Sequence, residues 1–176
     1  MRRSVIVAAL LLLVGLESFA SVGIGVKLLN GSTVCITGEL AGESLSVELA
    51  VGLRSVNIPG LFEWRMIWYS GIARIAFPIG SFIPYVGAGG IGVNVTLDST
   101  EGSGTLNALG ITGEGGVGYS FEELGFPLRL FAGPSISWIP VSGELEDVGI
   151  GGIGVGWHIG ATIPFQFPNM GSDLAF

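Results

Sequence analysis

The sequence predicts an all-β protein, an eight-stranded antiparallel up-and-down transmembrane β-barrel that follows a cleaved signal peptide. Three observations carry this prediction. The mean hydropathy is +0.70 and only 12% of the residues are charged. No stretch after residue 20 has the length and apolar character of a membrane-spanning helix. Apolar residues instead alternate with small or polar ones, as in strands with two different faces. A closed sheet is the membrane structure that remains, because lipid tolerates no unpaired backbone edge.

The first twenty residues have the features of a secretory signal. Arg2 and Arg3 form a positive start, and Val5 begins an apolar run that is too short to span a membrane. Ser18 and Ala20 are the small residues that a signal peptidase recognises, so we expect cleavage after Ala20. The predicted domains are a signal peptide 1–20, a barrel 21–167 and a short C-terminal tail 168–176.

Eight candidate strands fill the barrel region, and residues typical of turns separate them. They are residues 22–29, 32–40, 44–54, 62–77, 82–97, 106–121, 126–139 and 148–167. Asn30-Gly31 predicts a tight turn between the first two strands. The residues from Asp98 to Thr105 are expected to form a loop. An even number of strands places both chain ends on the same side of the membrane.

In each strand the apolar face is expected to contact lipid, with Leu49 and Ile159 as clear examples. The apolar face of strand 82–97 comprises Tyr85, Ile91, Val93, Val95 and Leu97. Strand 62–77 is ambiguous, because two sets of residues fit opposite registers. These sets are Trp64, Met66 and Trp68 on the one hand and Ala73, Ile75 and Phe77 on the other. A bulge near Ser70-Gly71 would reconcile them.

Aromatic residues gather at the ends of the predicted strands, as expected for a girdle at a membrane interface. The periplasmic rim would carry Phe77, Phe82, Tyr85, Tyr119, Phe121, Phe126, Phe165 and Phe167. Trp64, Trp68 and Trp138 would lie toward the opposite rim.

Three segments, 87–92, 113–118 and 149–154, have the spacing G-x-G-x-x-G. A dinucleotide site needs this motif in a turn that opens a helix. No helical periodicity follows any of the three, so we expect no cofactor. The fifth position of each motif is expected to point outward, and the fourth and sixth glycines inward, where they relieve crowding inside a narrow barrel.

The predicted inward positions collect the few charged residues of the barrel. This candidate lumen network comprises Lys27, Glu48, Arg54, Glu114, Arg129 and His158, with Glu39 and Arg74 as further candidates. Buried charges need partners or water, so we expect Glu48 and Glu114 to pair with Arg129 and Lys27. Two interpretations stay open: a salt-bridged plug and a gated polar passage.

The rest of the composition argues against catalysis and against the binding of nucleic acid. The chain has 7 basic and 14 acidic residues, so it lacks the positive surface that nucleic acid requires. Cys35 is the only cysteine and His158 the only histidine. We interpret Cys35 as a packed side chain and His158 as a hydrogen-bonded residue of the lumen. The loop acids are interpreted as solvated rather than metal-binding, and we expect no enzymatic activity.

Two segments carry a resemblance to a known family. FIPYVGAGGIGVNV (82–95) and the closing WHIGATIPFQF (157–167) resemble the small eight-stranded outer-membrane barrels, the family of OmpX, OmpW and the OmpA transmembrane domain. The resemblance implies a terminal phenylalanine that the barrel-assembly machinery recognises. Phe167, with Phe165 before it, matches that pattern, whereas Phe176 is the alternative if the last strand is misplaced.

The sequence therefore favours an integral protein of the bacterial outer membrane, in contact with lipid, with a structural or interaction role and a mostly plugged, glycine-rich lumen. A narrow channel or a binding site for a small apolar molecule, which the resemblance to OmpW suggests, is the first alternative. A soluble periplasmic barrel of lipocalin type, with its apolar face inward, is the second.

Overall fold

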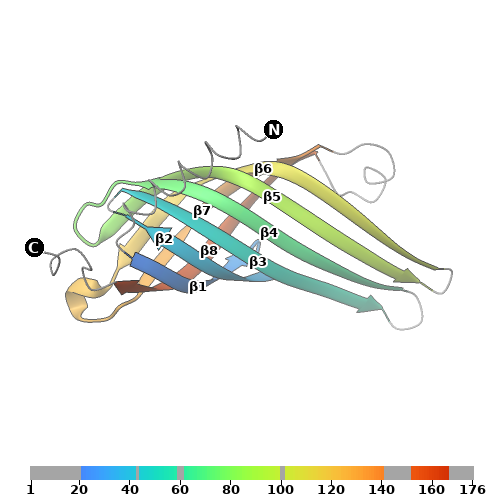
Figure 1. Cartoon of the computed structure of the whole chain (residues 1–176), viewed down its shortest axis with the longest axis horizontal. Coiled ribbons are helices and arrows are strands. Elements are labelled where there is room, and N and C mark those ends of the chain that lie inside the picture. The colour runs from blue at the N-terminus through green and yellow to red at the C-terminus, as the bar shows by residue number, and fades with distance from the viewer. Residues whose placement is uncertain (1–20, 43, 59–61, 100–101, 141–151, 167–176) are drawn as a thin grey trace, which may run out of the picture.

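The computed structural model is a closed barrel of eight antiparallel strands in which each strand pairs with its neighbours in sequence and β1 pairs with β8 (Figure 1). The structure describes residues 21–42, 44–58, 62–99, 102–140 and 152–166. The strands are β1 (Ser21–Leu29), β2 (Thr33–Ala41), β3 (Leu45–Ile58), β4 (Phe62–Ala76), β5 (Phe82–Ser99), β6 (Gly102–Ser120), β7 (Arg129–Ile139) and β8 (Gly152–Gln166). The predicted fold class is confirmed.

The expected boundaries hold within a few residues, with one clear difference. β6 begins at Gly102, so the segment from Asp98 to Thr105 is mostly strand and not the predicted loop. Asn30 and Gly31 do form the tight β1–β2 turn, both with positive φ. A short 3-10 helix, η1 (Glu122–Leu124), precedes β7. Within the described residues, no helix is long and apolar enough to cross a membrane. The predicted signal peptide and tail lie outside the described residues.

Most of the wall carries apolar side chains on its outer surface. Leu49 is 64% exposed and Ile159 is 49% exposed, whereas Glu48 and His158 on the alternate positions are buried. We call this part of the wall, which includes residues 45–53 of β3 and 153–165 of β8, the belt. Its polarity is the reverse of a soluble barrel, because charged side chains lie inside and aliphatic ones outside.

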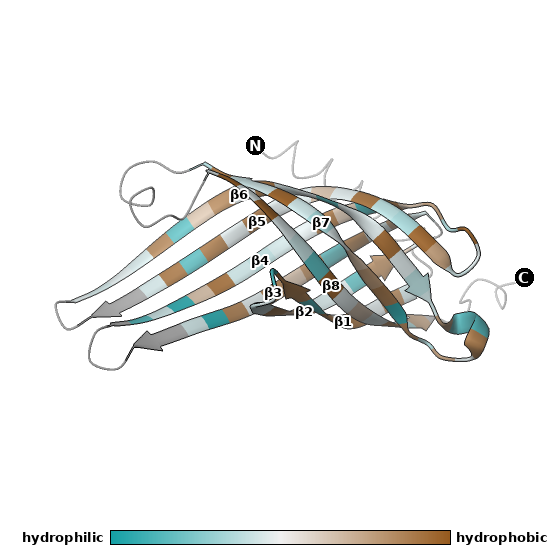
Figure 2. Cartoon of the chain, turned by 180° about the vertical axis from the view of Figure 1, so that it is seen from behind, coloured by the Kyte–Doolittle hydropathy of each residue, from teal (hydrophilic) through white to brown (hydrophobic). Residues whose placement is uncertain are grey.

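The strands β3 to β6 project beyond the other strands at one end of the barrel (Figure 1). We call residues 62–68, 93–99 and 102–108 of β4, β5 and β6 the extension; they pair with one another in one continuous register. Here the polarity is inverted. Val93 and Val95 are buried against the interior, while Thr105 and Asn107 are exposed. Figure 2 shows the resulting alternation of hydrophobic and hydrophilic residues along these strands.

The predicted facing of strand 82–97 is therefore wrong. Tyr85, Ile91, Val93 and Val95 point inward and are 6% exposed or less. The last three of these residues form an apolar cluster with Ala108 and Ile139, against which Trp64, Met66 and Trp68 pack. Alternation identified the two faces of the strand correctly. It did not reveal that the outward positions near the end of this strand, Asn94 and Thr96, are polar, so that Val93 and Val95 pack inside as in a soluble protein.

The ambiguity of strand 62–77 has a simple resolution. β4 pairs with β3 and β5 without interruption, so the predicted bulge near Ser70-Gly71 is absent. Ile72 and Arg74 face the interior on the same side as the two tryptophans, and Ile75 is exposed outside. Trp64 and Trp68 are thus interior residues and not part of an outer aromatic rim, whereas Trp138 is 48% exposed on the outer surface.

The expected aromatic girdle is present at the end of the barrel opposite the extension. Phe77, Phe82, Phe126 and Phe165 are more than half exposed there. Tyr119 packs edge-on against both Phe82 and Phe121, at ring-centroid distances of 5.2 and 4.9 Å. Tyr85 is the exception, because it turns inward. Phe167 lies outside the described residues.

Candidate functional site

The centre of the lumen holds four charged side chains in mutual contact. Lys27 of β1 donates to Glu48 of β3 at 2.7 Å and to Glu114 of β6 at 2.9 Å. Arg74 of β4 lies 2.7 Å from Glu48 and also binds Glu114. We call these four residues the ion cluster. All of its side chains are at most 7% exposed.

Strand register explains why Arg74 belongs in this cluster. Glu39 and Glu48 are direct partners across the β2–β3 ladder, and two adjacent carboxylates repel unless a cation lies between them. The Arg74 guanidinium supplies that cation, since it lies 4.0 Å from Glu39 and 2.7 Å from Glu48. Its planar fork can bind several carboxylates at once, which a lysine does less well.

The pairing expected for Arg129 is not the one observed. Arg129 is the first residue of β7, so it lies at the end of the barrel, 4.0 Å from Glu39 and 25% exposed. Arg74 takes the place beside Glu48 and Glu114 that the sequence analysis gave to Arg129. The lumen facing of Arg74 was not evident from the sequence because the register of its strand was ambiguous.

Aromatic rings pack around the ion cluster. The Arg74 guanidinium lies 5.3 Å from the ring of Tyr85 and 5.2 Å from the ring of Phe131. Such contacts between a cation and a ring are favourable when water is excluded. Phe131 was not among the predicted site residues, and Tyr85 was predicted to face lipid.

His158 is buried beside the cluster. Its Nε2 lies 2.5 Å from the hydroxyl of Tyr85, and its Nδ1 lies 3.9 Å from a carboxylate oxygen of Glu114. The histidine therefore joins β8 to β5 through its hydrogen bond with Tyr85, while its Nδ1 has no hydrogen-bond partner among the described residues. This geometry can fix the interior side chains in one arrangement.

Arg54 is the one member of the predicted network that lies apart from the others. Its guanidinium carbon lies over the ring of Trp64, 5.5 Å from the ring centroid, toward the extension. Among the described residues it forms no ion pair with a carboxylate.

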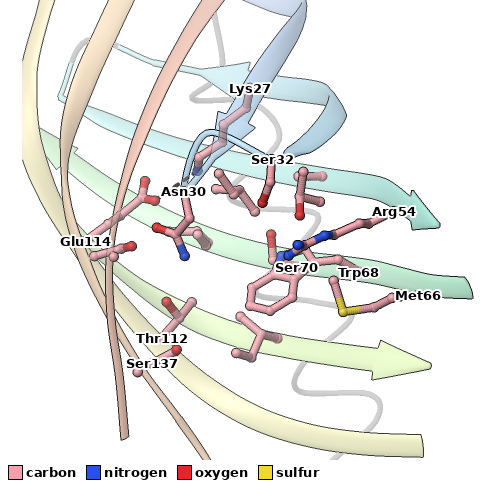
Figure 3. A pocket seen from close by; sticks show the side chains of 18 of the residues that line it. Lys27, Asn30, Ser32, Arg54, Met66, Trp68, Ser70, Thr112, Glu114 and Ser137 are labelled. Atoms are coloured by element: carbon pink, nitrogen blue, oxygen red, sulfur yellow. Dashed lines mark hydrogen bonds and ion pairs between the residues drawn. The ribbon is translucent and has the colours of Figure 1, made fainter. Parts of the chain in front are cut away.

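Two cavities flank the ion cluster. The outer cavity, on the side of the extension, measures about 200 Å³ and reaches from Lys27 and Glu114 to Arg54, Met66 and Trp68 (Figure 3). The inner cavity, on the opposite side, measures about 80 Å³ and is lined by Glu39, Arg74 and Tyr85 among others. The side chains of the cluster thus lie between two separate hollows.

The glycine motifs behave as strand segments. Gly116, Gly118 and Gly154 occupy inward positions, and Val117 and Ile153 are exposed outside, as expected for the second and third motifs. The first motif is the exception, because Gly90 and Gly92 face outward. The ring of Tyr69 covers Gly92 from outside, and Gly89 instead approaches the backbone of Gly71 closely.

This fold defines a class: a small, closed, up-and-down barrel of the outer-membrane type, with apolar residues outside and charges inside. Three solved structures share it. Neisserial surface protein A aligns with a TM-score of 0.59 at 14% identity, over 83% of this chain and 94% of that one. Ail, the attachment invasion locus protein of Yersinia pestis, in complex with the heparin analogue sucrose octasulfate, aligns with a TM-score of 0.54 at 15% identity, over 82% and 94%.

The N-terminal β-barrel domain of Pseudomonas aeruginosa OprF aligns with a TM-score of 0.51 at 18% identity, over 84% of this chain and 98% of that domain. No family model and no curated protein sequence matches the chain. The resemblance to small eight-stranded outer-membrane barrels is thus confirmed at the level of the fold.

Proposed function

We propose that this chain is an integral protein of the bacterial outer membrane whose barrel is closed to ions and whose role is structural or interactive. The ion cluster is the observation that carries the proposal. Two cations and two carboxylates from four strands interlock between the cavities, so a hydrated ion would have to separate charges that are paired and buried.

The membrane assignment rests on the belt. A soluble barrel would lose free energy by exposing side chains such as Leu49, Leu53 and Ile153, which are 64%, 68% and 73% exposed. The lipocalin-type alternative needs the opposite polarity, which only the extension has. The extension would project from the outer surface of the membrane, and lipid and the barrel-assembly machinery would be the principal partners. Phe165, which is 52% exposed, fits the expected assembly signal.

Conductance in planar bilayers tests the closed lumen. The refolded full-length protein should give no current steps, because the paired, buried charges of the ion cluster lie between the two cavities. Regular, voltage-independent current steps from the wild-type protein would contradict the proposal and favour the gated passage. Extraction of native membranes with carbonate is the accompanying test, since a lipid-embedded barrel stays with the membrane.

A second function is favoured by one observation, the aromatic and apolar wall of the outer cavity. Met66 and Trp68 face this hollow from β4, and Ile91 faces it from β5. Pockets of this kind bind small molecules whose apolar part replaces water at the wall. We propose that the outer cavity binds a small, largely apolar molecule without passing it through the barrel.

A further inference from the structure

We infer that the ligand of the outer cavity is a small organic anion, a carboxylate on an aromatic ring or short apolar chain, with Arg54 binding its charged end. This inference rests on the binding role proposed above for the outer cavity and names its ligand class. Three features of the structure support this inference: the pairing of the charges in the lumen, the contacts of Arg54 and the volume of the outer cavity.

The charges of the lumen balance one another except at Arg54. Three cations and three carboxylates face the interior in the described residues and lie within 4.0 Å of opposite partners. They are Lys27, Arg74 and Arg129 with Glu39, Glu48 and Glu114. Arg54 lines the outer cavity and is itself exposed, and among the described residues it has no carboxylate partner, so these residues leave its positive charge at the cavity uncompensated.

The position of Arg54 leaves its donors free. The guanidinium carbon lies over the ring of Trp64, 5.5 Å from the ring centroid. Among the described residues, no side chain or backbone group accepts a hydrogen bond from Arg54, so its fork of N–H donors is available for a carboxylate. Figure 3 shows Arg54 reaching from β3 into the cavity beside Trp68 and Met66 of β4.

The rest of the cavity suits the apolar part of such a molecule. Trp68, Met66 and Ile91 form one wall next to Arg54. At the floor, Lys27 is engaged by Glu48 and Glu114, so it does not compete for the anion. A hollow of about 150 Å³ accepts a benzene molecule. The outer cavity, at about 200 Å³, therefore has room for one ring and a short chain.

The test compares two probes of almost equal shape, 3-phenylpropionate and the neutral 3-phenylpropanol, on the full-length barrel refolded in uncharged maltoside micelles. Calorimetric titration, with micelles alone as the reference, measures binding. We expect saturable binding of both, with the carboxylate about tenfold tighter, as for one charge-assisted hydrogen-bonding group. Arg54→Gln should remove this preference, so that the affinity for the carboxylate falls to that for the alcohol.

Arg65→Gln is the matched control. Arg65 of β4 pairs with Ser55, the residue after Arg54 in β3, and its side chain is 62% exposed. It should leave both affinities within about twofold, since Arg65 does not line the outer cavity. Equal affinity for the two probes, or equal losses in both variants, would overturn the inference and leave the cavity as a site for neutral molecules. Failure of both probes to bind saturably would refute the binding role itself.

Discussion

The belt and the extension use the same strands but opposite polarity. In the belt, Leu49 and Ile159 face outward and Glu48 and His158 face inward. In the extension, Val93 and Val95 are the inward residues, and exposed positions such as Thr105 and Asn107 are polar. A strand such as β5 crosses both regions without a bulge.

The difference teaches that the surroundings decide whether the apolar face of a strand turns outward or inward. Where lipid surrounds the wall, apolar side chains gain by facing it and the narrow interior keeps the charges. Where water surrounds the wall, the apolar side chains gain by packing inside. The outer cavity lies between the belt and the extension. It is therefore lined by Lys27 and Glu114 of the ion cluster at one end and by Met66 and Trp68 at the other.

The largest expected effect comes from the ion cluster. Glu114→Ala should lower the free energy of unfolding by about 3–5 kcal/mol, because Lys27 and Arg74 both lose a buried partner. Urea titration in lipid vesicles measures it. Glu63→Ala, in the exposed pair with Arg65 on the extension, should cost at most about 1 kcal/mol. Similar losses in the two variants would show that the cluster is not a dry, interlocked centre.

The next largest change in stability locates the boundary between the lipid-facing belt and the extension. Leu49→Arg should cost about 2–4 kcal/mol, because the charge would lie against the hydrocarbon of the belt. Thr105→Arg, at an exposed position of the extension, should cost less than about 1 kcal/mol. The same urea titrations compare the variants. A large loss at Thr105 would place the extension within the membrane.

A smaller change in stability distinguishes the packed interior of the extension from the outer surface of the belt. Val93→Ala should cost about 1.5–3 kcal/mol, since a buried side chain of the apolar cluster leaves a cavity. The same truncation at Val155, which is 79% exposed on the belt, should change the stability by no more than about 0.5 kcal/mol. Thermal unfolding followed by circular dichroism resolves this difference. A larger loss for Val155→Ala than for Val93→Ala would indicate that Val93 faces lipid, as the sequence predicted.

The smallest effect concerns a glycine that the sequence analysis placed in the lumen. Gly92→Ala should cost about 0.5–1.5 kcal/mol, because the new methyl group displaces the ring of Tyr69 on the outer surface. Gly104→Ala should cost nothing measurable, since nothing lies within 4 Å of its added carbon. A change in the fluorescence of tyrosine or tryptophan in the first variant alone would support this placement.

Much of the architecture could be predicted from local pattern. Strict alternation in β3 and β8 identified both faces, and the Asn30-Gly31 turn followed from the need for positive φ. Lys27, Glu48 and Glu114 were found because a charge opposite an aliphatic face must point inward in a membrane barrel. The arginine that joins these carboxylates was predicted to be Arg129 and is Arg74, because the depth of the two arginines depends on the register between strands.

The sequence by itself determined the fold class and the two faces of nearly every strand, because alternation is a local property of the chain. Only the tertiary structure decided which face of β5 turns inward, which arginine joins the ion cluster and that Arg54 is left alone beside Trp64. The physical reason is that these outcomes depend on what surrounds each level of the barrel, lipid or water, and on the stagger between strands that are distant in the chain.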